Sequence, residues 1–161
     1  MIPSAESLPP PTQDLCFGKV VLRFDKIVPG DISRHFVPYY HFLILTSGGV
    51  EVGHVNFRVG DTEHVRIAVG HIGFVVLEAF RGHGYALQTC RAIAPFVRSF
   101  YDAVIITCDP DNRASVRTIE RLGASFIDEV AVPPQDPHYQ RGSCIKRRYK
   151  WTPSTRILSC I

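Results

Sequence analysis

The segment Arg81–Ala86, which contains two glycines, divides the chain into two parts with different apolar patterns. Before this segment, apolar residues come in short and partly alternating runs, which are typical of strands with one buried face. After it, they recur at intervals of three and four residues, which is typical of one face of a helix. The chain therefore has to fold as an α/β domain in which a strand leads through a glycine turn into a helix.

The pattern before the glycine segment predicts four strands. In order, they span Cys16–Arg23, His41–Thr46, Val50–Val59 and Val65–Val76. The second and third flank a Ser-Gly-Gly turn, which predicts a hairpin. Gly70 and Gly73 interrupt the fourth, and a glycine inside a strand often marks a bulge. The segment between the first two strands is broken by Pro and Gly and leaves room for one short helix, around Asp31–Phe36.

The pattern after the glycine segment predicts two helices and three strands. The first helix starts near Ala86. Because Pro95 removes a backbone hydrogen bond, at a cost of roughly 3 kcal/mol, we expect a kink there or an end near Ala94. A second, short helix follows Asn112 and is ended by Gly123. The strands span Ala103–Cys108, Ala124–Val132 and Ser143–Trp151.

The glycine segment is suited to bind an anion. The first N–H groups of a helix are unpaired, and the helix dipole places roughly half a positive charge there. Glycines let the backbone approach a phosphate closely, and Arg81 adds a positive charge. The segment is not a P-loop, because no Lys-Ser/Thr pair follows, and it lacks the third glycine of a dinucleotide fingerprint. On its own, the Gly-x-Gly pair is equally consistent with a plain tight turn.

Three motifs in order resemble the GNAT acetyltransferase superfamily. Arg81-x-x-Gly84-x-Ala86 is similar to its acyl-CoA loop, and Gly70–Val76 looks like its fourth core strand. Asn112-x-x-Ser115, followed by the run up to Gly123, resembles a signature of small ribosomal-protein N-terminal acetyltransferases. The chain also resembles a group of uncharacterised predicted acetyltransferases. The similarity covers about residues 40–130.

The resemblance implies a single-domain α/β (α+β) fold. Its central sheet is mixed but mostly antiparallel, has about six to seven strands and carries helices on both faces. The family usually places two helices between the first two strands, where they wall the acceptor site; here that region is reduced. We therefore expect the acceptor site to be open, or to be completed by a second subunit or by the loop 133–142. The domain is expected over residues 15–161, after a flexible, Pro/Ser-rich arm of residues 1–14.

The resemblance also implies an activity: direct transfer of an acetyl group from acetyl-CoA to a primary amine, either a small molecule or a peptide. The implied cofactor-binding residues are Phe74, Val75, Val76, Arg81, Gly82, His83, Gly84, Tyr85, Ala86, Asn112 and Ser115. The backbone N–H around Val75 or Val76 would bind the carbonyl oxygen of the thioester. For Asn112, a second interpretation is a simple helix N-cap.

His71 and Ser115 are the predicted catalytic residues. An imidazole with a pKa near neutrality suits a general base, although His71 could instead be a hydrogen-bonded structural histidine. Glu78, or His54 beside Asn56, are weaker candidates for the base. The family's usual acid is a Tyr, and Ile119 occupies its position here, so Ser115, Tyr139, a water molecule or no acid at all would have to serve.

Alternatives remain open at this point. One is a non-catalytic acyl-CoA-binding regulatory module, and another is a transferase of longer acyl groups. A net charge of +3 is too mild to indicate a nucleic-acid partner. No run approaches the ~20 apolar residues of a membrane helix, and the N-terminus has no secretory signal pattern. The histidines show no metal-ligand spacing, so no metal is expected. The five scattered cysteines are expected to be reduced thiols in a cytoplasmic protein, and a homodimer is left open.

Overall fold

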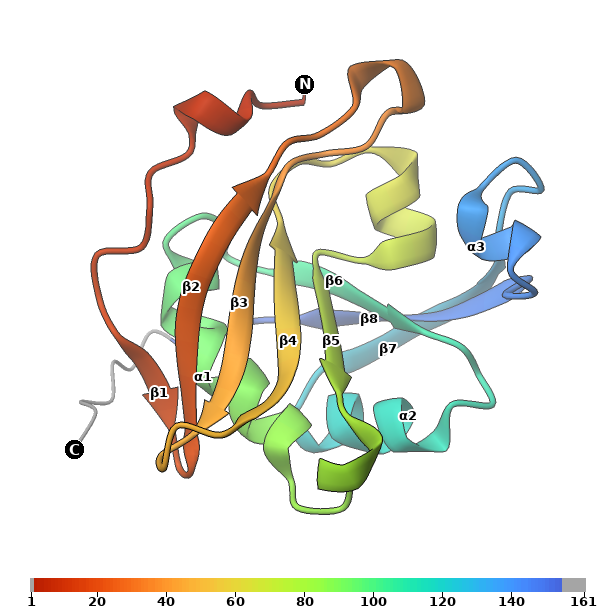
Figure 1. The fold of residues 1–161 in the computed structure, drawn as a ribbon. Coiled ribbons are helices and arrows are strands. Elements are labelled where there is room, and N and C mark those ends of the chain that lie inside the picture. Colours follow the sequence, from red (N-terminus) through yellow and green to blue (C-terminus); the bar gives the residue numbers. More distant parts are fainter. Residues whose placement is uncertain (1, 155–161) are drawn as a thin grey trace.

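The computed structural model describes residues 2–154, and its strands form two antiparallel sheets (Figure 1). The five-stranded sheet has the order β1 (Leu15–Phe17), β2 (Val20–Val28), β3 (Tyr39–Thr46), β4 (Glu51–Arg58) and β5 (Ile72–Val76). The three-stranded sheet has the order β6 (Val104–Cys108), β8 (Ile145–Trp151) and β7 (Ser125–Ala131). The predicted domain end at residue 161 lies outside the described residues.

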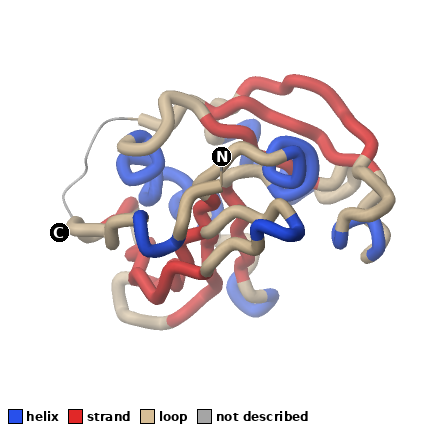
Figure 2. Tube along the Cα trace, turned by 90° about the horizontal axis from the view of Figure 1, so that it is seen from above, coloured by secondary structure: helices blue, strands red, loops and turns tan. Residues whose placement is uncertain are grey.

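Within residues 2–154, three α-helices and four short helical turns connect these strands. The α-helices are α1 (Tyr85–Arg98), α2 (Arg113–Arg121) and α3 (Pro137–Gln140). The turns are η1 (Ala5–Ser7), η2 (Ile32–Arg34), η3 (His64–Val69) and η4 (Glu78–Phe80), of which η3 is a π-helix and the others are 3₁₀ helices. In the view from above, helical segments lie around the strands on more than one side (Figure 2). The predicted α/β fold class, with its reduced helical region before β3, is confirmed.

The first predicted strand is wrong, because two strands occupy its place. Gly18 adopts a left-handed conformation with φ 58° and reverses the chain, so that β1 and β2 pair as a hairpin. The hairpin brings the number of strands to eight, one or two more than expected.

The fourth predicted strand is also wrong over its first half. Val65, Ala68 and Val69 are buried on one side of η3, and their spacing of three and four residues is typical of a helix rather than a strand. Gly70 ends this helix with φ 67° and donates its N–H to the Val65 carbonyl, so that β5 begins only at Ile72.

Helix α1 does not end near Ala94, which was one of the two predicted alternatives, but continues through Pro95 to Arg98. Its inner face carries Cys90, Ile93 and Val97, all fully buried against the sheet. Burying such side chains contributes roughly 1.5–3 kcal/mol each, which offsets the cost of proline inside the helix.

An aromatic cluster fixes α1 on one face of the five-stranded sheet. Phe96 packs edge-on against Tyr40 of β3, with ring centroids 4.9 Å apart, and against Phe57 of β4 at 5.9 Å. Phe100 contacts the same two rings at 5.7 and 5.4 Å. Because α1 covers this face, the side chains of β3 and β4 that point the other way are left for the site.

The N-terminal segment lies against this core. Leu8 is buried, and the Tyr40 hydroxyl donates a hydrogen bond of 2.5 Å to the Pro9 carbonyl. β1 begins at Leu15, and the domain boundary at residue 14 stays a prediction. The flexibility of residues 1–14 stays a prediction.

The cysteines follow the expectation only in part. Cys90, Cys108 and Cys144 carry free thiols, whereas Cys16 is disulfide-bonded, so the expectation of reduced thiols is wrong for Cys16. Disulfides persist mainly in oxidising compartments, and the cytoplasmic location therefore stays a prediction. Among the helices of residues 2–154, none is long and apolar enough to cross a membrane.

Gly53 of β4 provides a test of how tightly β4 and β5 pack. A Cβ at Gly53 would lie 2.0 Å from the Val75 carbonyl oxygen, whereas a Cβ at Gly48 would meet nothing closer than 3.7 Å. We expect Gly53→Ala to lower the free energy of unfolding by about 1–3 kcal/mol, as overpacking does, and Gly48→Ala to change it by less than ~0.5 kcal/mol. Urea unfolding followed by circular dichroism measures both; equal stabilities for the two variants would contradict the close approach.

Candidate functional site

The edge of β5 that faces away from β4 is not paired. Leu77 N–H donates to the Val52 carbonyl at 2.8 Å, and Val75 lies opposite His54 in the register. Because the backbone groups of antiparallel strands alternate in direction, those of Val75 bind β4, whereas those of Phe74 and Val76 face the unpaired edge. Of the two N–H donors proposed from the sequence, only that of Val76 therefore points to the open side.

β5 and β6 meet at one end and diverge from there. His71 N–H donates to the Ile105 carbonyl at 2.8 Å, and His71 Nδ1 accepts from Ile105 N–H at 3.0 Å. Among residues 2–154, no strand ladder joins β5 to β6 beyond this contact, and the two belong to separate sheets. A wedge thus opens between them from His71 towards the glycine segment, and β6 runs away from β5 at a large angle (Figure 1).

The glycine segment lies at the wide end of the wedge. Gly82 and Gly84 are both left-handed, with φ 84° and 76°, and Gly84 is the N-cap of α1 without any side-chain cap. In the described part of the chain, the backbone N–H groups of residues 82–87 have no intramolecular acceptor. Such a row of free donors at a helix N-terminus is suited to bind phosphate groups.

Two side chains hold this segment in place. Arg81 Nε donates to the Val76 carbonyl at 3.1 Å, which ties the segment to the end of β5. His83 Nδ1 lies 3.0 Å from the Phe80 carbonyl, and its ring stacks on Tyr85 at 5.7 Å. The glycine segment is exposed as far as Gly84, so the charge of Arg81 is available at the mouth of the wedge.

Asn112 and Ser115 lie at the start of α2, the helix that follows β6. The Asn112 Oδ1 accepts a hydrogen bond of 3.2 Å from Ser115 N–H, so the N-cap interpretation of Asn112 is confirmed. Ser115 is half-buried, and contact of either residue with a ligand stays a prediction. Ile119 is buried in the core, as expected of a residue that packs rather than donates a proton.

The side chain of His71 is buried at the narrow end of the wedge. Its Nδ1 is occupied by Ile105 N–H, and its ring packs on Tyr101 at 5.1 Å. Burial lowers the pKa of His71, while Asp61 and the backbone of Ile105 and Gly60 oppose that shift. The predicted role of general base remains untested, and this placement disfavours it.

The weaker candidates lie on the sheet face opposite α1 or in turns. His41 Nδ1 lies 2.6 Å from Asn56 Oδ1, and the His54 ring is 5.2 Å from that of His41. Burial, followed by the nearby His41, lowers the pKa of His54. Glu78 in η4 is exposed, and so is Tyr139 in α3.

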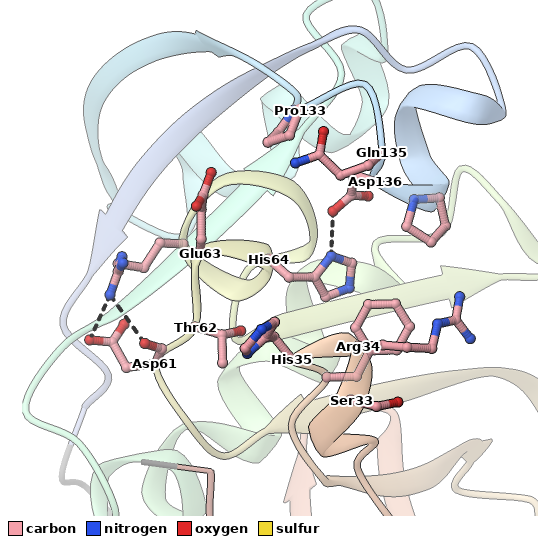
Figure 3. Close-up of a pocket in the computed structure, with 13 residues that line it drawn as sticks. Ser33, Arg34, His35, Asp61, Thr62, Glu63, His64, Pro133, Gln135 and Asp136 are labelled. Atoms are coloured by element: carbon pink, nitrogen blue, oxygen red, sulfur yellow. Dashed lines mark hydrogen bonds and ion pairs between the residues drawn. The ribbon is translucent and has the colours of Figure 1, made fainter.

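A pocket that the sequence did not reveal lies around His64 and Asp136 (Figure 3). Its volume is about 590 Å³, and η2, the segment 61–66 and the loop 133–137 line it. His64 Nδ1 lies 2.5 Å from the Asp136 carboxylate there. These two residues are 72 positions apart, so no local motif could have paired them; the only signal was the expectation that the loop 133–142 completes this region.

Comparisons with known proteins agree with this geometry. A family model described as an acetyltransferase (GNAT) domain matches residues 24–125. No curated protein matches the sequence significantly.

Three solved structures share the fold at low sequence identity. An acetyltransferase from Agrobacterium tumefaciens strain C58 matches with TM-score 0.57 and 18% identity over 90% of this chain and 97% of that one. The microcin self-immunity acetyltransferase MccE, in complex with acetyl-CoA and AMP, matches with TM-score 0.55 and 20% identity over 71% of this chain and 61% of that one. The ribosomal alpha-N-protein acetyltransferase RimL, in complex with coenzyme A, matches with TM-score 0.55 and 19% identity over 73% and 64%. The chain thus spans less than two thirds of MccE and RimL.

Two buried histidines make stability depend on pH. Burial, with Lys146 and Arg141 nearby, lowers the pKa of His138 from its ordinary 6.5 to about 4, and burial also lowers that of His71. Between pH 6.5 and about 4, the unfolded chain therefore binds more protons than the folded chain. The free energy of unfolding is thus highest above pH 6.5 and decreases as the pH drops from 6.5 towards about 4.

We expect the melting temperature to fall over this window, and His138→Gln to flatten the fall. His35→Gln is the control, since His35 is exposed. Differential scanning fluorimetry between pH 7 and 4.5 measures the effect, and a slope unchanged in the His138 variant would contradict it.

Proposed function

Because the chain belongs to the GNAT acetyltransferase family, we propose that it binds acetyl-CoA as its cosubstrate in the wedge and transfers the acetyl group directly to a primary amine. The observation that carries the proposal is a set of unpaired backbone N–H groups in two places. They lie in residues 82–87 and at the open edge of β5, whereas Leu77, Phe80 and Arg81 between them donate to other backbone groups. MccE and RimL have the same fold, and their structures contain acetyl-CoA and coenzyme A, which supports the choice of ligand.

The glycine segment would bind the pyrophosphate. Its N–H groups point outwards at the start of α1, where the helix dipole favours negative charge, and the Arg81 guanidinium lies beside them. His83 and Tyr85 would flank the same phosphates. Because these donors are backbone groups, phosphate binding by them depends on the backbone conformation of residues 82–86 and on how accessible their N–H groups are. Apart from the two glycines, it does not depend on which side chains these residues carry.

The edge of β5 would bind the pantetheine arm. This arm carries amide groups, and the backbone of Phe74 and Val76 offers donors and acceptors to them as an additional strand would. The Val76 carbonyl already accepts from Arg81 Nε, so the Val76 N–H is the freer of its two groups. On the opposite wall, Asn112 and Ser115 would contact the same arm.

The transfer itself needs an unprotonated amine and a donor for the carbonyl oxygen. The attacking nitrogen forms a C–N bond, the C–S bond breaks, and negative charge builds up on the oxygen. The Val76 N–H would stabilise that charge, because it faces the open edge and is fixed by the sheet. Ser115 would supply the hydroxyl for the departing thiolate, since Ile119 is buried and cannot donate a proton.

The acceptor is proposed as a small or peptidyl amine. RimL is an alpha-N-protein acetyltransferase, and the likeness of its fold favours peptide N-termini as the first class to test. The non-catalytic acyl-CoA-binding module is the second candidate, because no acid occupies the Ile119 position. Release of the coenzyme A thiol, measured with a thiol reagent in the presence of peptides, polyamines and amino sugars, separates the two. Thiol release supports the transferase, whereas binding without release for every amine supports the module.

Gly84 is the position at which ligand binding can be removed most specifically. Valine is poorly tolerated at its φ of 76°, and its branched side chain would stand among the free N–H groups. We expect Gly84→Val to weaken acetyl-CoA binding at least tenfold in isothermal titration calorimetry, relative to wild type.

Gly123→Val is the matched control for this experiment. Gly123 has a similar φ of 88°, meets no neighbour within 4 Å and lies at the far end of α2. Its variant should lose comparable stability but keep its affinity. If both variants bind as wild type does, or if wild type binds no acetyl-CoA, the proposed cofactor site is wrong.

A further inference from the structure

His64 and Asp136 form a hydrogen-bonded pair inside the pocket of Figure 3. The His64 side chain is 16% exposed, that of Asp136 is 7% exposed, and His64 Nδ1 lies 2.5 Å from Asp136 Oδ2. The other carboxylate oxygen accepts from His138 N–H at 2.8 Å, which caps α3 and fixes the carboxylate. The Phe36 ring stacks on His64 at 4.4 Å and fixes the plane of the imidazole.

This arrangement selects one tautomer of His64. An ionised carboxylate can only accept hydrogen bonds, so Nδ1 of His64 carries the proton. In the neutral ring, Nε2 is then an unprotonated acceptor. The ring of His64 projects into the middle of the pocket (Figure 3), so a basic nitrogen is presented there. Orientation of a histidine by a buried aspartate is a common way to build a general base.

A second cavity lies next to the pocket, on the side of Arg58. His64 also lines a neighbouring cavity of about 210 Å³ that Tyr39, Arg58 and Val69 line as well. Arg58 Nη1 donates to the Val69 carbonyl at 3.2 Å, and a Cβ at Gly73 would lie 3.0 Å from the same nitrogen. Arg58 therefore lies between this cavity and Gly73 on β5, the strand whose open edge faces the wedge.

The helix η3 joins the pocket to the narrow end of the wedge. It begins at His64 and is followed by Gly70, whose backbone lies against Ile105 and Thr107 of β6. The Thr107 hydroxyl donates to the Ala68 carbonyl at 2.8 Å. With its phosphates at the glycine segment, as in the proposed function, the ligand would point its acyl end towards this narrow end, from which η3 leads to the pocket.

We infer that His64, oriented by Asp136, is the general base that deprotonates the amine acceptor in this pocket. The inference rests on the proposed function. The ammonium form of the acceptor gives a proton to His64 Nε2, directly or through one water molecule. The free amine then forms the C–N bond and the C–S bond breaks. The thiolate takes the proton that the nitrogen loses as the amide forms, and His64 returns its own proton to water.

The charged surroundings of His64 allow this role. The titratable and charged groups on the elements packed around it are Arg34, His35, Arg58, Asp61, Glu63, Arg66, His138 and Arg141. Asp61 is paired with Arg66 at 3.3 Å, and Arg34 lies over the Phe36 ring at 4.4 Å. The Glu63 carboxylate lines the same pocket and provides a charge opposite to that of an incoming ammonium group.

The test compares two generic acceptors with acetyl-CoA as donor. Methylamine is protonated at neutral pH and needs a base, whereas the nitrogen of hydroxylamine is already unprotonated. We expect His64→Gln to lower kcat for methylamine about 10²-fold, the typical contribution of a general base, and to change kcat for hydroxylamine less than threefold. Raising the pH should restore the rate with methylamine. Asp136→Asn, which keeps the cap of α3, should cause a similar selective loss, and the double variant should lose little more.

The control variant is Asp102→Asn. Asp102 is 96% exposed beyond the end of α1 and does not line the pocket, so the rates should stay within threefold of wild type. Equal losses for both amines, no loss in the His64 variant, or no thiol release with either amine would overturn the inference. Calorimetry with acetyl-CoA on the same variants tests the proposed function separately: unchanged binding with an unselective loss of rate refutes only the base.

Discussion

The contact between His71 and Ile105 determines how the two sheets are arranged. It consists of one backbone hydrogen bond and one from Ile105 N–H to the His71 ring, at 2.8 and 3.0 Å. Because the histidine side chain replaces the next backbone acceptor of β5, the pairing of β5 with β6 stops where it begins. Everything that forms the candidate site follows: the open edge of β5, the wedge, and the position of the glycine segment at its wide end.

Local patterns predicted the second half of the chain well. The helix capped by Asn112 and ended by Gly123, and the last three strands, follow from turn residues and apolar spacing that act over a few positions. The wrong predictions have tertiary causes. Pro95 does not end α1 because the burial of residues on both sides of it outweighs one lost hydrogen bond. Residues 65–69 are apolar enough for a strand, but three of them are buried on one side of η3, in a cluster with Val37 and Val132.

The candidate site divides in the same way. The glycine segment could be predicted because its chemistry lies in consecutive backbone groups. The histidines could not be distinguished from the sequence, since their roles depend on partners far away in the chain. His71 has a backbone donor on its Nδ1 and is buried, whereas His64 has a carboxylate there and projects into a pocket. The partner of the ring nitrogen Nδ1 thus distinguishes the two histidines: a backbone N–H fixes His71 in the structure, whereas a carboxylate orients His64 for chemistry.

The first turn of α1 is also held by the turn between β1 and β2. The Gln88 side-chain oxygen accepts from Lys19 N–H at 2.7 Å, and a Cβ at Gly18 would lie 2.6 Å from that oxygen. The turn between β1 and β2 therefore acts as a buttress behind the phosphate-binding donors. With that support, the donors are held in position before any ligand arrives, and little conformational entropy is left to be lost on binding. Changes in this exposed hairpin, which contacts the first turn of α1, would then alter the residence time of the ligand.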